Sequence, residues 1–219
     1  MKRILLVLPH PDDEAFGASG TLAMHIHRGA QVTYACLTLG EMGRNMGFPP
    51  FANRVTLPQI RRRELEASCH AIGIQDLRLL GFHDKTIEFE DPDLLDGRIE
   101  ALLKELRPEL VITFYPGYSV HPDHEACGAA VIRAVGRLPA AERPVVHGIA
   151  FAPNCEKALG KPDVVNDVRP FLRQKLASIR AHRSQFQLAK WLGDREVPDP
   201  EIERQFGTER FWTYRWQDA

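Results

Sequence analysis

Short apolar runs alternate with longer amphipathic stretches along most of this chain, and this alternation limits the folds open to it. The runs predict strands, and the one from Leu110 to Phe114 is almost continuously apolar, as a strand that is buried on both faces of a parallel sheet should be. They span Arg3 to Leu8, Gln31 to Leu37, Asp76 to Leu80, Leu110 to Phe114 and Val145 to Phe151. This order predicts an α/β fold, a Rossmann-like three-layer α/β/α sandwich with a mostly parallel sheet.

The stretches between these runs carry helix signals at their ends. Pro58 falls in the first turn of one helix and Gly73 just past its end, where these residue types are favoured. The sequence predicts helices over 11–28, 58–72, 93–106, 124–138 and 167–192. We expect the aromatic tail to pack back on the body of the protein or on a neighbouring subunit. Its aromatic residues are Phe211, Trp212, Tyr214 and Trp216.

Length and composition favour one domain over 1–219, with a core over about 1–160 and a helical, aromatic extension over about 161–219. The apolar share of 44% is enough to bury a full core. A net charge of -1 and a pI near 6.8 argue against nucleic acid or an anionic membrane as partner. No run is long enough to span a membrane, and a cleaved signal peptide would remove the residues around His10. Four cysteines without CxxC spacing favour reduced thiols, so we expect a cytoplasmic protein.

The segment 40–57 is rich in glycine and proline, which disfavour regular structure. Such a connection exceeds the roughly 12–15 residues usual in compact domains. It leaves the carboxyl end of the second predicted strand, where parallel sheets bind ligands, and we interpret it as a lid or substrate loop. The alternative is a surface excursion.

Two clusters of histidine and carboxylate residues follow the first and the fourth predicted strands. In a sheet ordered 3-2-1-4-5 these strands are neighbours, so the clusters would face each other across one crevice. Catalytic zinc sites use three protein ligands, drawn from imidazole nitrogen, carboxylate oxygen and thiolate. We therefore predict a metal site from His10, Asp13 and His124, although a lone His-Pro-Asp is more often a capped turn. The clusters read Pro9-His10-Pro11-Asp12-Asp13-Glu14 and His121-Pro122-Asp123-His124.

The remaining residues of the clusters have candidate roles. Asp12 is not needed as a ligand, and a helix N-terminus would favour its carboxylate form, so it could deprotonate a metal-activated water. A protonated His121, oriented by Asp123, could stabilise an oxyanion or protonate a leaving amine. Glu14 is either an outer partner of a ligand or a simple helix-start carboxylate. The ligand set suits zinc and also admits Fe²⁺, Co²⁺ or Mn²⁺.

The two clusters together resemble the signature of the LmbE/PIG-L family of zinc-dependent N-acetylglucosaminyl deacetylases. No GxGxxG, P-loop, HExxH or GxSxG motif competes with this interpretation, and the second cluster differs from the zinc-deaminase pattern. The resemblance implies zinc on His10, Asp13 and His124, with Asp12 as general base and His121 and Asp123 as its electrostatic support. It extends through Lys175, His182, Ser184 and Gln185, where we interpret His182 as a structural hydrogen-bonding residue.

Within that family the chain is most similar to the second type of bacillithiol-biosynthesis deacetylase, over 38–47, 81–90 and 113–117. Those enzymes remove acetyl from N-acetylglucosaminyl malate. The family carries a substrate-gripping arginine after the variable loop, and Arg61 stands at the matching position. Arg44 and Arg54 add positive charge nearby, which suits the two carboxylates of a malyl group. Some mycothiol-pathway relatives have a catalytic tyrosine where this chain has Ser119, which argues against a mycothiol-type substrate.

We therefore expect zinc-dependent hydrolysis of the N-acetyl group of a small amino-sugar glycoside, N-acetylglucosaminyl malate, by a homo-oligomer. The same chemistry on a mycothiol-type conjugate, another thiol conjugate or a chitooligosaccharide is the first alternative. A non-catalytic metal- or sugar-binding protein is the second, but Asp12 would have no purpose in passive binding. A phosphoesterase is disfavoured because a single metal site gives no two-metal clamp.

Overall fold

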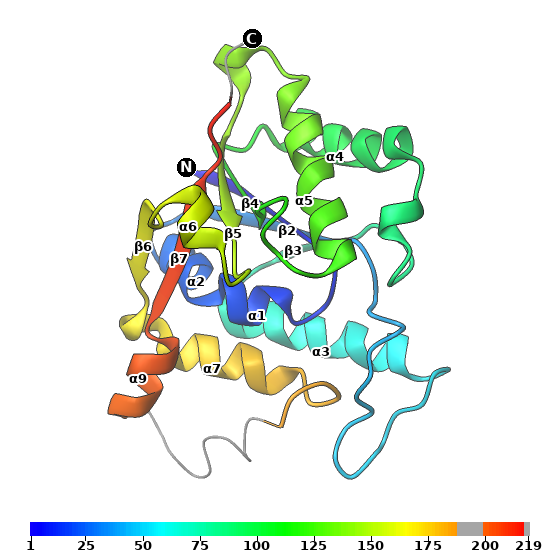
Figure 1. Cartoon of the computed structure of the whole chain (residues 1–219). Helices are drawn as coiled ribbons and strands as arrows, with labels where there is room; N and C mark the ends of the chain where they lie inside the picture. The colour runs from blue at the N-terminus through cyan, green and yellow to red at the C-terminus, as the bar shows by residue number, and fades with distance from the viewer. Residues whose placement is uncertain (188–198, 217–219) are drawn as a thin grey trace.

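A seven-stranded sheet forms the centre of the computed structural model, which describes residues 1–187 and 199–216 (Figure 1). The strand order is β3-β2-β1-β4-β5-β7-β6. β1 to β5 are parallel and follow the predicted order 3-2-1-4-5, whereas β7 runs antiparallel to both β5 and β6. The strands are β1 (Arg3–Leu8), β2 (Gln31–Cys36), β3 (Asp76–Leu79), β4 (Leu110–Phe114), β5 (Val145–Ile149), β6 (Val164–Asp167) and β7 (Thr208–Thr213).

Helices cover both faces of the sheet and complete the predicted sandwich. One layer holds α1 (Asp13–Gly17), α2 (Ser19–His27), α3 (Leu57–Ile72) and α7 (Leu172–Ala181), and the other holds α4 (Pro92–Leu106) and α5 (Pro122–Gly136). Shorter helices are α6 (Cys155–Leu159) and α9 (Pro200–Phe206), with 3₁₀ turns η1 (Ile87–Phe89), η2 (Ala140–Glu142) and η3 (Arg169–Phe171).

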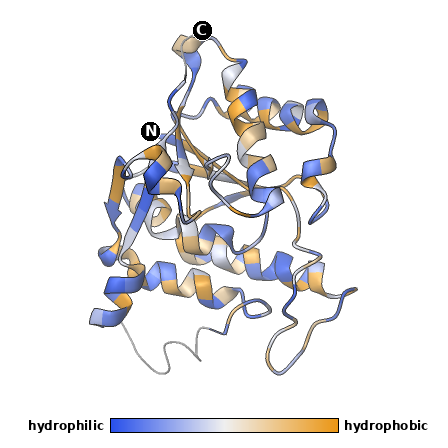
Figure 2. Ribbon diagram, in the orientation of Figure 1, coloured by the Kyte–Doolittle hydropathy of each residue, from blue (hydrophilic) through white to orange (hydrophobic). Residues whose placement is uncertain are grey.

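A hydrophobic core lies on each face of the sheet, between the strands and the helix layer that covers that face. Successive residues of a strand point to opposite faces, so Leu6 and Leu8 enter one core while Leu5 and Val7 enter the other. In Figure 2 the strands at the centre are mostly hydrophobic, whereas the helices around them carry both hydrophobic and hydrophilic residues. Within the described residues, no helix is both long and apolar enough to cross a membrane.

The predicted helix over 11–28 is wrong as a single element, because the chain breaks at Ala18 into α1 and α2. Ala18 has a φ of -147°, outside the helical region. The break opens a new helix N-terminus, and the backbone N–H groups of Gly20 and Thr21 donate to the carboxylate of Glu209, at 3.0 and 2.7 Å. A carboxylate from β7, far along the sequence, thus replaces the hydrogen bonds that a continuous helix would have made.

The predicted helix over 167–192 is also wrong over its first part and over 182–187, which follow the end of the helix. The chain is still in strand β6 as far as Asp167, and α7 begins only at Leu172 and ends at Ala181. Pro170 lies in the 3₁₀ turn that joins them. The last residues of the prediction, 188–192, lie outside the described residues.

The aromatic tail packs on the body of the protein as predicted, but as part of the sheet. Phe211 and Trp212 lie in β7, which inserts between β5 and β6. The sequence pattern predicted neither β6 nor β7, because neither is a continuous apolar run. The single domain over 1–219 and the boundary proposed inside it both stay predictions.

Candidate active site

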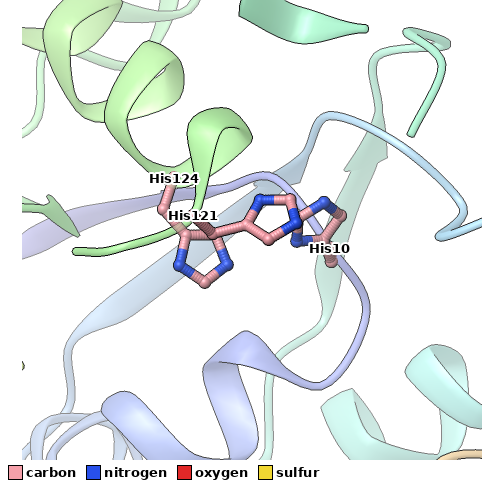
Figure 3. A group of neighbouring side chains, drawn as sticks. All are labelled: His10, His121 and His124. Atoms are coloured by element: carbon pink, nitrogen blue, oxygen red, sulfur yellow. The ribbon is translucent and has the colours of Figure 1, made fainter. Parts of the chain in front are cut away.

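The two clusters meet at the carboxyl ends of β1 and β4, which are adjacent in the sheet. His10 follows β1, whereas His121 is the N-cap of α5 and His124 lies in its first turn. The ring centroids are 5.0 Å apart for His10 and His121, 5.3 Å for His10 and His124, and 5.0 Å for His121 and His124 (Figure 3). Nitrogen atoms of the three rings lie within 4.8 Å of one another.

Asp13 lies between two of these imidazoles. Its Oδ2 is 3.4 Å from Nδ1 of His10, and its Oδ1 is 3.3 Å from Nε2 of His124. Two ligands at about 2.0–2.1 Å from one tetrahedral zinc lie about 3.3–3.4 Å apart, so these contacts fit a shared ion. His10, Asp84 and Asp123 form a second group of close donors. Asp123 does not line the cavity that holds the other residues, and this favours the group around Asp13 as the metal site.

The cavity in front of these residues has a volume of about 280 Å³. It opens where the loops after β1, β2, β3 and β4 come together, as expected for a parallel sheet. Its walls consist of His10, Asp12, Asp13, Met42, Gly43, Arg44, Arg61, Asp84, Lys85, His121, His124 and Gln185.

Asp123 positions His10 rather than His121, which differs from the expectation. Its fully buried carboxylate lies 2.9 Å from Nε2 of His10 and accepts the backbone N–H of Lys85 at 2.7 Å. Only the backbone N–H of Asp123 contacts His121, donating to Nδ1 at 3.2 Å. The first turn of α5 carries Asp123 inward, beneath His10. A carboxylate on the far nitrogen of a metal-binding histidine fixes the orientation of the ring.

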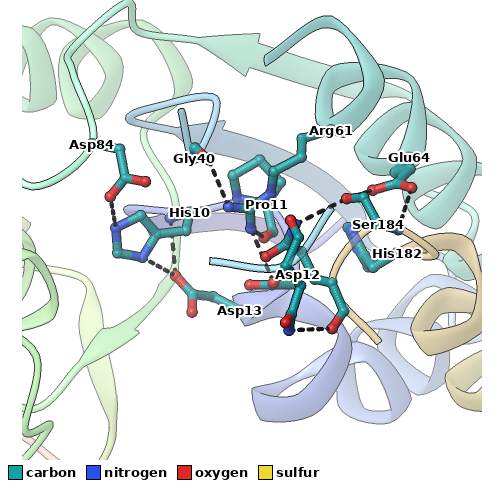
Figure 4. Close-up of polar contacts among 12 residues, drawn as sticks. His10, Pro11, Asp12, Asp13, Gly40, Arg61, Glu64, Asp84, His182 and Ser184 are labelled. Atoms are coloured by element: carbon teal, nitrogen blue, oxygen red, sulfur yellow. Dashed lines mark hydrogen bonds and ion pairs between the residues drawn. The ribbon is translucent and has the colours of Figure 1, made fainter. Parts of the chain in front are cut away.

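Asp84 is a site residue that sequence reasoning missed. Its Oδ1 lies 3.1 Å from Nε2 of His10 (Figure 4). Burial alone would raise the pKa of Asp84, but its contacts with His10, the backbone N–H of Met42 and the charge of Arg61 together lower the pKa to about 2. The available signal was its position soon after β3, at the same edge of the sheet as the two clusters.

We expect Asp123→Asn to weaken metal binding by about 10–100-fold, the usual cost of losing an outer partner of a ligand. The amide would no longer hold the His10 ring with a negative charge. Zinc affinity, measured by competition with a chromophoric chelator, tests this. Asp93→Asn, an exposed change at the start of α4, is the matched control. Unchanged affinity in Asp123→Asn would contradict the role given to Asp123.

Asp12 lies beside the proposed ligands with a strained backbone. Its φ is 101°, in the left-handed region, and its Oδ2 accepts a hydrogen bond from Nη2 of Arg61 at 2.9 Å. Burial raises the pKa of Asp12 to about 6, with Arg61 opposing the rise. Burial therefore outweighs the stabilisation of the carboxylate that we expected from a helix dipole. The helix at this position, α1, has only five residues.

Glu14 supports Asp12 instead of a metal ligand. Its Oε2 accepts the backbone N–H of Asp12 at 3.0 Å, and its Oε1 accepts Ser68 Oγ and lies 2.6 Å from Nε2 of His182. Burial lowers the pKa of His182, but the charge and the hydrogen bond of Glu14, together with the charge of Asp12, make the net shift upward. The structural interpretation of His182 agrees with this geometry.

The surroundings of His121 favour a neutral imidazole ring, whereas we expected a protonated one. Burial, together with His10 and His124, lowers the pKa of His121. Its Nδ1 accepts the backbone N–H of Asp123, so a neutral ring carries its hydrogen on Nε2. Neutral His121 is therefore a hydrogen-bond donor to the cavity that it lines.

The three predicted arginines have different positions. Arg61 is 3% exposed and donates to Asp12, to the carbonyl of Pro11 and, at 2.9 Å, to the carbonyl of Gly40 (Figure 4). Arg61 lines the cavity, but these N–H groups are engaged with Asp12 and with the two backbone carbonyls and so are not directed at a substrate. Arg54 does not line this cavity, because its guanidinium turns back to carbonyls of the 40–57 loop. Arg44 is exposed and lines the cavity.

The 40–57 loop forms one wall of the site and is tied to the segment after α7. Asn45 and Gln185 exchange side-chain to backbone hydrogen bonds of 2.9 and 3.0 Å, and Gly47 N–H donates to the carbonyl of Ser184 at 2.9 Å. Ser184 in turn is held by Glu64 of α3 through bonds of 2.7 and 2.6 Å. That the loop closes as a lid stays a prediction.

Solved structures share this fold. The N,N'-diacetylchitobiose deacetylase from Pyrococcus horikoshii superposes with a TM-score of 0.74 at 25% identity, over 97% of this chain and 84% of that one. A 4-carboxy-2-hydroxymuconate hydratase from Pseudomonas putida has the same TM-score at 20% identity, over 100% and 98% of the two chains. The fold thus supports different reactions, and function has to be argued from the site.

Curated sequences give a more specific likeness. The chain is 50% identical to the probable N-acetyl-alpha-D-glucosaminyl L-malate deacetylase 2 of Bacillus cereus over 99% of both chains. It is 46% identical to the protein of the same name from Bacillus subtilis, again over 99% of both. A sequence model described as "PIG-L: GlcNAc-PI de-N-acetylase" matches residues 5–135, the part that carries both clusters. The chain therefore belongs to the PIG-L family.

Proposed function

We propose that this protein hydrolyses the N-acetyl group of N-acetylglucosaminyl malate with the help of one zinc ion. The observation that carries the proposal is the contact of Asp13 with both His10 and His124, with Asp12 beside them on the same cavity. The similarity to the two Bacillus proteins supports the malyl substrate. Four free, buried cysteines support a cytoplasmic location, and the homo-oligomer stays a prediction.

His10, Asp13 and His124 would hold the metal. Two imidazoles and a carboxylate suit zinc and also admit Fe²⁺, Co²⁺ or Mn²⁺. A cation bound there supplies electrophilic activation of water and of the amide carbonyl. Asp123 and Asp84, both within 3.1 Å of Nε2 of His10, hold the His10 ring in place.

The residues of this chain account for the proton transfers. Asp12 removes the proton from the attacking water, and a pKa raised to about 6 makes it a stronger base than an ordinary aspartate. Arg61 fixes the orientation of Asp12 through Oδ2. The Nε2–H of His121 donates to the oxyanion as it forms on the acetyl carbonyl. Asp12, which now carries the proton from the water, then returns it to the departing amine as the C–N bond breaks.

Amine release from N-acetylglucosaminyl malate by metal-reconstituted protein tests the proposal. We expect kcat/KM to exceed that for methyl N-acetylglucosaminide by at least about tenfold, because hydrogen bonds between charged groups each contribute about 1.5–3 kcal/mol. Diacetylchitobiose is the third substrate, since a relative at 30% identity bears the name diacetylchitobiose deacetylase. Equal rates on the malyl and methyl glycosides would support the deacetylase reaction but contradict the assignment of the malyl glycoside as substrate. No release from any of the three would discard the proposed reaction.

A further inference from the structure

Two cations of the active-site cavity have no partner in the part of the chain that the structure describes. Among the described residues, the side chains of Arg44 and Lys85 form no ion pair or hydrogen bond, although both line the cavity. Both are exposed. Arg61, the third cation of the cavity wall, is committed to Asp12 and to backbone carbonyls.

The position of Lys85 follows from the turn after β3. Asp84 points inward to His10, and the next backbone N–H, that of Lys85, donates to Asp123 at 2.7 Å. Both contacts are made with Lys85 in the left-handed conformation, at a φ of 67°, which is uncommon for a residue with a side chain. The turn that positions His10 therefore also fixes the backbone that carries the Lys85 side chain at the cavity.

Arg44 reaches the same cavity from the neighbouring loop. β2 and β3 are adjacent parallel strands, so the chain leaving each of them emerges at the same edge of the sheet. Arg44 lies in the 40–57 loop after β2, and Lys85 lies six residues after the end of β3 at Leu79. The cavity wall also contains the carboxylates of Asp12, Asp13 and Asp84, which would repel an anionic substrate. The two unpaired cations offset that repulsion.

We infer that Lys85, together with Arg44, binds the carboxylates of an anionic aglycone and is a specificity-determining residue of this site. The inference rests on the proposed function and names the groups that select its substrate. Two cations match the two carboxylates of a malyl group, while the metal and Asp12 act on the acetamide. Arginine and lysine are the usual protein partners of carboxylates.

Lys85→Met tests the inference, because it keeps the length of the side chain and removes the charge. We expect the ratio of kcat/KM for the malyl glycoside to kcat/KM for the methyl glycoside to fall about tenfold, the effect of losing one hydrogen bond between charged groups. Lys85→Arg should keep the ratio near that of the parent. Lys157→Met, an exposed change on α6, is the matched control. Added salt should lower the ratio of kcat/KM for the malyl glycoside to kcat/KM for the methyl glycoside less in Lys85→Met than in the parent. The variant lacks the ammonium charge whose attraction to the malyl carboxylates salt would screen.

Two results separate the inference from the proposed function. A parent protein with malyl preference, combined with an unchanged ratio in Lys85→Met, would overturn the role of Lys85 alone. A parent protein without malyl preference would overturn the malate assignment and this inference together. Thermal unfolding and metal content establish that each variant is folded and loaded, and Lys85→Gln replaces the methionine variant if that one does not fold.

Discussion

Asp12→Asn is expected to lower kcat by about 10²–10⁴-fold, the range that a positioned general base contributes. The amide has the size of the carboxylate, and its oxygen can still accept the hydrogen bond from Arg61 Nη2, which measures 2.9 Å in the parent. It cannot take a proton from water. His10, Asp13 and His124 are unchanged, so the metal should stay bound. Steady-state kinetics on the malyl glycoside, with metal content measured on the same samples, checks both expectations.

The control for this variant is Asp93→Asn, which makes the same chemical change on the exposed first turn of α4. Its kcat should equal that of the parent. A metal-loaded Asp12→Asn protein with kcat near the parent value would remove Asp12 from the role of base. The base would then have to be another titratable residue of the cavity wall, such as Asp84 or His121.

The sequence was sufficient for the sheet up to β5 and for the meeting of the two clusters. Buried parallel strands have a strong local signal, and the order 3-2-1-4-5 brings the ends of β1 and β4 together without knowledge of any side-chain contact. For that reason His10, Asp13 and His124 could be named as a group from their positions after the strands.

Contacts that depend on loop geometry could not be predicted in the same way. Asp84 reaches His10 from the turn after β3, in which the next residue, Lys85, has a left-handed conformation that the sequence does not signal. Arg54 turns toward carbonyls of its own loop, and no local sequence signal distinguishes that from a position facing the cavity. The break in the helix at Ala18 depends on β7, which is nearly two hundred residues further along the chain.

That long-range contact gives the largest expected change in stability. Glu209→Ala should lower the free energy of unfolding by about 3–5 kcal/mol, because it leaves a buried charge without its partner. The partner is Lys175 of α7, whose Nζ lies 2.5 Å from Oε1 of Glu209, and both side chains are only 2% exposed. The backbone N–H groups of Gly20 and Thr21 would also lose their acceptor. Urea denaturation, followed by circular dichroism, measures the change.

A second variant distinguishes the buried charge from simple loss of packing. Adding Lys175→Met to Glu209→Ala removes the unpaired ammonium, and we expect it to recover part of the lost stability. Glu156→Ala, an exposed change on α6, should alter stability by no more than about 0.5 kcal/mol. If the double variant were no more stable than Glu209→Ala, the loss would come from the freed N–H groups of α2. α1 begins at Asp13 and ends at the break before α2, where Glu209 accepts the backbone N–H groups of Gly20 and Thr21. In that case Glu209 would matter to the site mainly as the acceptor that holds the start of α2.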